Sequence, residues 1–205
     1  MASYAPEMTR KTRLFALTCS IFLLAAFSAC SEPRPAAPPP PTPTPEPRFE
    51  APVESMSIPA IRIESAPLVP MGVKNGYMDL PYNPHDIAWY DFTAKPGMGS
   101  NAVFSAHLDY IDHGPAVFHD LHELRPGDPV SVRLRDGTRL HYAVTKNDTM
   151  PLADLDIRAA VAPTPEEILT LITCSGAFDG QDYSHRVVVI ARRTGVEPGG
   201  SVATQ

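Results

Sequence analysis

The sequence predicts a mainly β domain of about eight strands with short helices, closed or nearly closed into a barrel or packed as a sandwich. Two observations support this prediction. The apolar segments between residues 51 and 193 are short and often β-branched, and prolines and glycines separate them. Helical patterns are weak and brief, and the sequence has no internal repeat. Short strands with little helix are typical of closed β architectures.

The strands are expected in seven segments along the domain. These are SIPAIRI (57–63), APLVPMGV (66–73), AVFSAHL (102–108), PVSVRLR (129–135), RLHYAVTKN (139–147), ILTLITC (168–174) and RVVVIARR (186–193). The fourth and fifth segments flank Asp136-Gly137, a pair that favours the tight turn of a β-hairpin.

Helical segments are expected at three places. PHDIAWY (84–90) and PAVFHDLHEL (115–124) carry short helical patterns. The residues Thr164-Pro165-Glu166-Glu167 have the form of a capping box with proline at the first helical position. This motif predicts a turn of helix before ILTLITC.

The first thirty residues are typical of an export signal. Arg10, Lys11 and Arg13 precede an uncharged segment, residues 14–29, that ends at Cys30. A spanning helix needs roughly 20 apolar residues, so this segment is closer to a signal-peptide core. Residues 27–30, FSAC, resemble the lipobox of bacterial lipoproteins, although Phe27 stands where leucine is usual. The resemblance makes Cys30 a lipidation candidate. An uncleaved signal anchor is the alternative, and either form tethers the chain at the extracytoplasmic face of a bacterial membrane.

A proline-rich linker, residues 31–50, separates this signal from the domain. Nine of the fifteen residues in 33–47 are proline, and such a segment forms neither helix nor sheet. It extends at about 3.1 Å per residue, which gives a stalk of roughly 45 Å.

The domain is expected at residues 51–193, and residues 194–205 are expected to form a disordered tail. The net charge of -6 argues against a nucleic-acid partner.

Cys174 is the single cysteine of the predicted domain, since Cys19 and Cys30 lie in the export segment. It is either a small buried hydrophobe or a nucleophile, and a thiol nucleophile needs a base or a nearby cation. His107 ends one predicted strand much as Cys174 ends another. Arg186 begins the strand that would pair antiparallel with ILTLITC, which would place it near Cys174 and near a developing oxyanion.

These motifs together resemble the sortase family of bacterial cysteine transpeptidases. The family's motifs begin with AH (106–107) and Asp109 at the end of one predicted strand. They continue with LITC (171–174), a loop and HRVVV (185–189). The resemblance extends over nearly the whole domain. A Trp-Tyr, a Pro-Gly, an AH motif and GPAVF come in the order typical of the class F branch, with class E as the nearest other branch. Ala106 departs from the glycine that the family commonly has before the histidine.

The resemblance implies a closed sortase-type barrel and assigns roles to three residues. Cys174 would be the nucleophile, His107 the general acid and base, and Arg186 the group that orients the substrate and stabilises the oxyanion. The implied substrates are exported proteins with an LPxTG-like sorting signal, and the acceptor is an amine of a peptidoglycan precursor or a pilin lysine. No metal or organic cofactor is implied.

Two alternatives stay open at this stage. A histidine- and aspartate-rich stretch between residues 107 and 122 offers zinc-type ligands, although in no standard spacing. That stretch would suit a metal-dependent hydrolase. The other alternative is a non-catalytic barrel lipoprotein that binds a cell-wall ligand, in which Cys174 only packs.

Overall fold

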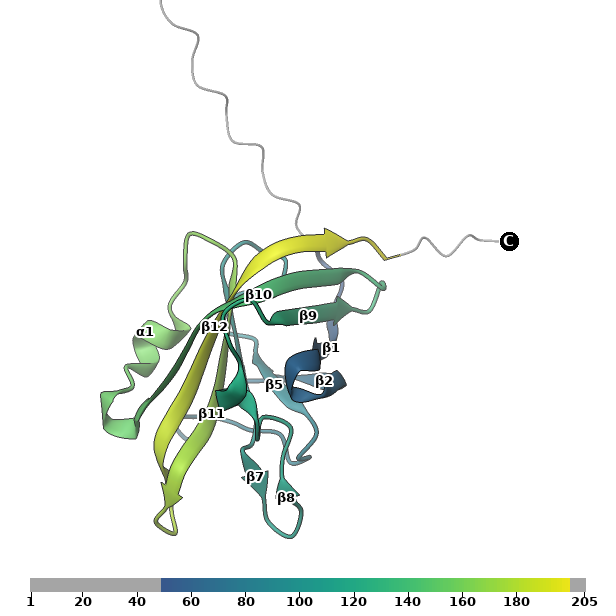
Figure 1. Ribbon diagram of the computed structural model, residues 1–205. Helices are drawn as coiled ribbons and strands as arrows, with labels where there is room; N and C mark the ends of the chain where they lie inside the picture. Colours follow the sequence, from purple (N-terminus) through teal and green to yellow (C-terminus); the bar gives the residue numbers. More distant parts are fainter. Residues whose placement is uncertain (1–48, 200–205) are drawn as a thin grey trace, which may run out of the picture. The chain divides into compact units, whose positions relative to one another are not determined.

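Eight strands close into a barrel in the computed structural model, which describes residues 49–199 (Figure 1). Their order around the barrel is β1-β2-β5-β6-β11-β12-β10-β9. The bounds in that order are Val53–Ile58, Ile63–Met71, Ile87–Tyr90, Asn101–Ser105, Ile168–Phe178, Tyr183–Glu197, Arg139–Pro151 and Pro129–Leu134. The mainly β barrel is therefore confirmed, and the sandwich is excluded.

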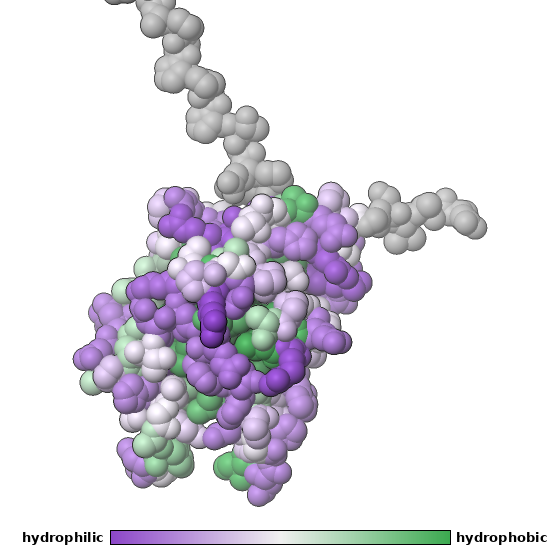
Figure 2. All heavy atoms as spheres, in the orientation of Figure 1, coloured by the Kyte–Doolittle hydropathy of each residue, from purple (hydrophilic) through white to green (hydrophobic). Residues whose placement is uncertain are grey.

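Smaller elements decorate the barrel. β3 (Val73–Lys74) pairs with β4 (Tyr77–Met78), and β7 (Asp109–Tyr110) pairs with β8 (Gly114–Pro115). The helical elements are η1 (Pro59–Ile61), η2 (Leu121–Glu123), η3 (Leu152–Asp154) and α1 (Ile157–Val161). The β7–β8 and β11–β12 hairpins project at one end of the barrel (Figure 1), and Figure 2 shows apolar residues at the tip of each projection.

Two of the strand pairs are parallel, namely β2 with β5 and β6 with β11. The other neighbours in the barrel are antiparallel. The carboxyl ends of parallel strands lie at the same edge of a sheet. Residues that follow β6 are therefore brought next to the carboxyl half of β11.

The predicted hairpin at Asp136-Gly137 joins β9 to β10 and is confirmed. Gly137 has φ +86°, a conformation that glycine adopts without steric cost. The Asp136 carboxylate accepts a hydrogen bond from the Thr138 amide at 2.9 Å. Local turn chemistry thus fixes the register between the two strands.

The barrel interior is filled by alternating side chains from all its strands. Phe104, Phe118, Leu140 and Leu171 are fully buried in one continuous apolar cluster. Burial along β9 alternates as period-two packing requires. Hydrophobic burial therefore accounts for the closure of the barrel.

Three expected elements differ from the structure. Residues 84–90 are not helical, because Ile87–Tyr90 form β5 between β2 and β6. Residues 115–124 form no α-helix, because Pro115 ends β8 and only Leu121–Glu123 are helical, as the short η2. The strand expected at 57–63 is broken by η1, which begins at Pro59, since proline donates no ladder hydrogen bond.

The predicted turn of helix at Thr164–Glu167 is also wrong. The α-helix of this segment, α1, comes earlier and is capped by Asp156, whose carboxylate accepts from the amides of Arg158 and Ala159. Glu167 does not complete a capping box, because its side chain is buried and accepts a hydrogen bond from the Gly97 amide at 2.9 Å. Tertiary contacts override the local motif.

β12 continues to Glu197, beyond the boundary predicted at 193. Its last residues pair with the start of β10. The predicted signal segment with Cys30, most of the linker and residues 200–205 lie outside the described residues. Within residues 49–199, helices are too short or too polar to cross a membrane.

Candidate active site

Cys174 lies on β11 at the point where burial of the strand ends. Residues 169–173 are buried, whereas Cys174 is half-buried. The strand continues to Phe178, so Cys174 is not at its end as expected. The pairing with β12 is interrupted after Ser175, where Gly176 has φ +82°. Cys174 thus lies where the regular pairing of β11 with β12 gives way to an irregular hairpin.

Arg186 lies directly opposite Cys174 in the antiparallel pairing of β11 with β12. The predicted adjacency of these two residues is confirmed. The side chain of Arg186 is only 14% exposed, so its charge acts in a partly desolvated environment.

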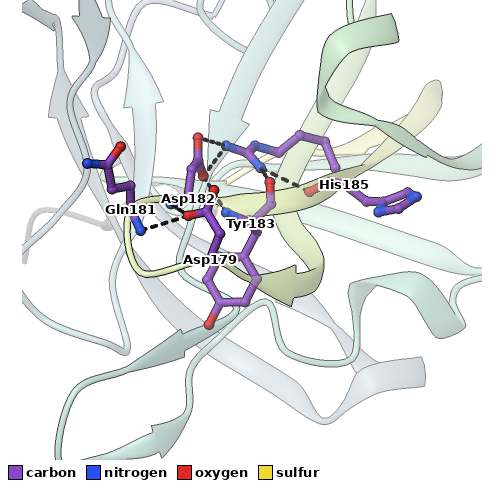
Figure 3. A network of polar contacts seen from close by, with 6 residues as sticks. Asp179, Gln181, Asp182, Tyr183 and His185 are labelled. Atoms are coloured by element: carbon purple, nitrogen blue, oxygen red, sulfur yellow. Dashed lines mark hydrogen bonds and ion pairs between the residues drawn. The ribbon is translucent and has the colours of Figure 1, made fainter.

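The β11–β12 hairpin supplies the hydrogen-bond partners of the Arg186 guanidinium, and Figure 3 labels these partners, Asp182, Tyr183 and His185. Its Nη2 donates to the two carboxylate oxygens of Asp182 at 2.7 and 2.9 Å. Its Nη1 donates to the backbone oxygens of Tyr183 and His185 at 3.0 and 2.9 Å. Four hydrogen bonds therefore fix the cation beside the thiol.

His107 follows β6, on the opposite side of β11 from Arg186. Ser105 pairs with Ile172, and the Thr173 hydroxyl donates to the Ala106 backbone oxygen at 2.9 Å. Continuing that parallel register by two residues places the backbone of His107 level with Cys174.

The His107 ring points to another partner. Its Nε2 is 2.9 Å from the Pro81 backbone oxygen, and its ring lies edge-on to Tyr110 with 5.1 Å between centroids. Among residues 49–199, no hydrogen bond joins His107 to Cys174. The structure therefore places Cys174 on β11, Arg186 on the adjacent β12 and His107 in the segment that follows β6, with the His107 ring turned to Pro81.

Burial raises the pKa of the Cys174 thiol above its ordinary value. The Arg186 charge opposes this effect and lowers the pKa, whereas the carboxylates of Asp182 and Asp109 raise it further. In this arrangement the sulfur is a thiol at neutral pH. A base or a change in the surrounding charges is needed to form the thiolate.

A second contact ties the hairpin to the segment that carries His107. The Tyr183 hydroxyl donates to the Asp109 carboxylate at 2.5 Å. This hydrogen bond is the main reason why the pKa of Tyr183 is raised to about 12. Sequence reasoning did not identify Asp182 or Tyr183, and the aspartate-rich composition of their loop was the one available signal.

Cys174 and Arg186 line a cleft of about 630 Å³. Its walls are mostly apolar, with contributions from β3, β4, β5, β11, η3 and α1. The apolar residues are Val73, Tyr77, Met78, Leu80, Tyr90, Phe92, Ala106, Leu152, Leu155, Ile157, Val161 and Ile172. The charged ones are Arg158, Asp182 and Arg186. Such a cleft suits an extended, largely apolar peptide whose backbone approaches the thiol.

The histidine-rich stretch does not assemble a metal site in the described part of the chain. No group of three or more His, Cys, Asp or Glu side chains among residues 49–199 is arranged to hold a metal ion. His119 and His122 instead contact the backbone oxygens of Leu108 and His119.

Solved sortase structures share the fold of this chain, whose barrel is closed and eight-stranded. Sortase A from Corynebacterium diphtheriae, in a lid mutant, is similar over 74% of this chain and 75% of that one, with 26% identity and a TM-score of 0.55. Sortase A of Listeria monocytogenes shares the fold at 16% identity, a TM-score of 0.56 and coverage of 74% and 93%. The Group B Streptococcus pilus island 1 sortase C2 does so at 21% identity, a TM-score of 0.53 and coverage of 69% and 73%.

The Sortase domain family matches residues 56–194. This chain belongs to the sortase family. No curated protein matches its sequence.

Proposed function

We propose that this chain is a cysteine transpeptidase that cleaves an LPxTG-like sorting signal on exported proteins and transfers the product to an amine. One observation carries the proposal. Cys174 and Arg186 are paired across two strands in the wall of a cleft, where a half-buried thiol has a fixed cation beside it. The order of the sequence motifs supports the class F branch in particular.

The first step forms a thioester. The Cys174 thiol gives its proton to His107, and the sulfur attacks the threonine carbonyl, so that an S–C bond forms while the carbonyl oxygen takes up negative charge. Arg186 stabilises that oxyanion by charge and hydrogen bonding. The C–N bond to glycine then breaks, and His107 gives its proton to the leaving amine. An incoming amine attacks the thioester in the second step and releases the thiol, whereas water would give hydrolysis.

Two contacts of the resting site must change for this chemistry. The His107 Nε2 has to leave the Pro81 oxygen to reach the leaving amine. The Nη2 of Arg186 has to share or release the Asp182 carboxylate to reach an oxyanion. Both changes are side-chain movements, and a bound peptide that supplies its own carbonyl groups would favour them.

The proposed acceptor is an amine of a peptidoglycan precursor or a pilin lysine, and the proposed location is the extracytoplasmic face of the bacterial membrane. The basic and apolar pattern of residues 10–29 supports export, and the residues around Cys30 support a lipid anchor. Incorporation of labelled fatty acid that is lost in Cys30→Ala tests the lipid anchor against a signal anchor.

The activity is tested with a fluorogenic LPxTG peptide and mass spectrometry of the enzyme. Wild type should cleave between threonine and glycine and accumulate a thioester on Cys174, and Cys174→Ala should lose both while keeping its fold. Unchanged cleavage by Cys174→Ala would falsify the proposal and return the chain to a non-catalytic wall-binding barrel. Cleavage that chelators abolish would instead support the metal-dependent alternative.

A further inference from the structure

One wall of the cleft is formed by α1 and carries an arginine that the proposed chemistry does not use. The side chain of Arg158 lines the same cleft as Cys174. Its backbone is fixed, because the Asp156 carboxylate accepts from the Arg158 amide at 3.0 Å. Leu155 and Val161, on either side of it, pack against the apolar cluster that contains Ile172. Arg158 is therefore an exposed residue carried on a packed wall of the cleft.

The side chains that line the cleft carry more positive than negative charge. It is lined by two arginines and one carboxylate, and Arg186 is bound to that carboxylate, Asp182. Among the ion pairs of residues 49–199, none includes Arg158. The cleft thus presents one cation whose charge no described side chain neutralises. The rest of the wall is mostly apolar, and Arg158 itself is exposed, so a ligand can reach its charge.

We infer that Arg158 is a specificity-determining residue that pairs with a carboxylate side chain of the peptide substrate. The inference rests on the proposed function and names the substrate class more closely. Four positions of an LPxTG-like signal are uncharged, so the carboxylate lies at the variable third position. A guanidinium binds a carboxylate through two parallel hydrogen bonds. A lysine or a neutral amide on the peptide cannot form this charged, two-bond pair with Arg158.

The experiment uses three peptides that differ only at the variable position, with Glu, Gln or Lys. Wild type is expected to prefer Glu to Gln by about two- to fivefold in kcat/KM, the range of an exposed ion pair, and to process Lys most slowly. Arg158→Gln should bring the three rates together, and Arg158→Glu should reverse the order of the Glu and Lys peptides. The preference of wild type should also shrink as salt is raised.

Arg139→Gln is the matched control, because Arg139 lies on β10 and does not line the cleft. It should keep the wild-type order of the peptides. Equal rates for the three peptides with wild type, or an unchanged order in Arg158→Glu, would overturn the inference while leaving the transpeptidase proposal intact. Absence of cleavage of all three by wild type is the different result that defeats the proposed function.

The acceptor is the other source of a carboxylate, and the assay separates the two sources by omitting the acceptor amine. Peptide preference during hydrolysis supports the inference. An effect of Arg158→Gln confined to reactions with a carboxylate-bearing amine overturns the assignment to the sorting peptide.

Discussion

Replacing Glu167 by glutamine should destabilise the barrel far more than the same change at the neighbouring Glu166. The Glu167 side chain is 2% exposed and forms an ion pair with Arg193 at 2.8 Å, where Arg193 is 14% exposed. The same carboxylate accepts from the Tyr142 hydroxyl at 2.5 Å and from the Gly97 amide at 2.9 Å. Glu167→Gln removes the negative charge and turns one acceptor oxygen into a donor.

The expected loss of stability follows from the burial of the Glu167–Arg193 ion pair. Removing one partner of a buried ion pair typically costs about 3–5 kcal/mol, because the other charge stays buried without compensation. We expect the free energy of unfolding to fall by that amount in Glu167→Gln. Glu166 also pairs with an arginine, Arg192, but the two side chains are 63% and 59% exposed. An exposed pair contributes about 0–1 kcal/mol, so Glu166→Gln should be nearly neutral.

Urea unfolding of the full chain, followed by tryptophan fluorescence, measures this difference. Trp89 is the single tryptophan, and its indole Nε1 donates to the Ala94 oxygen at 3.1 Å within the barrel. A domain stability of about 5–15 kcal/mol leaves room to measure a loss of this size. Equal losses in Glu166→Gln and Glu167→Gln would refute the argument from burial.

Two further results are expected from the site. Alkylation of Cys174 should rise with pH over a range above that of an ordinary thiol, because burial raises its pKa and the reacting form is the thiolate. Arg186→Gln should move the alkylation profile to still higher pH and Asp182→Asn should move it lower, and a profile unaffected by both changes would contradict the charge argument. Gly176→Ala should lower the free energy of unfolding in urea by about 1–3 kcal/mol, because φ is +82° and an added Cβ would clash with Ser184 Oγ; full stability of this variant would show that the hairpin can adjust.

The barrel could be predicted from sequence because its strands carry their own signals. β-branched segments between turn residues located seven of the eight barrel strands at least in part, and Asp136-Gly137 identified a hairpin. The missed strand, β5, is four residues long and reads as helical in isolation. Its conformation depends on hydrogen bonds to β2 and β6, which a local pattern does not contain.

The site could be predicted only in part for a related reason. The pairing of Cys174 with Arg186 follows from an antiparallel register, and register can be inferred when two strands flank one loop. The orientation of the His107 ring toward Pro81 depends on a contact with a segment 26 residues away. Likewise, the capping-box motif failed at Glu167 because its partners include Gly97, 70 residues earlier.

The arrangement of β6, β11 and β12 indicates how the resting site could become active. The backbones of the three strands are tied by their ladders, by the Thr173–Ala106 hydrogen bond and by the Tyr183–Asp109 hydrogen bond. Moving a backbone would break several of these contacts together. The His107 ring, by contrast, is held by one hydrogen bond, and the Arg186–Asp182 contact involves side chains alone. Activation is therefore expected to require side-chain rearrangement within a fixed backbone, with the bound peptide supplying the replacement contacts.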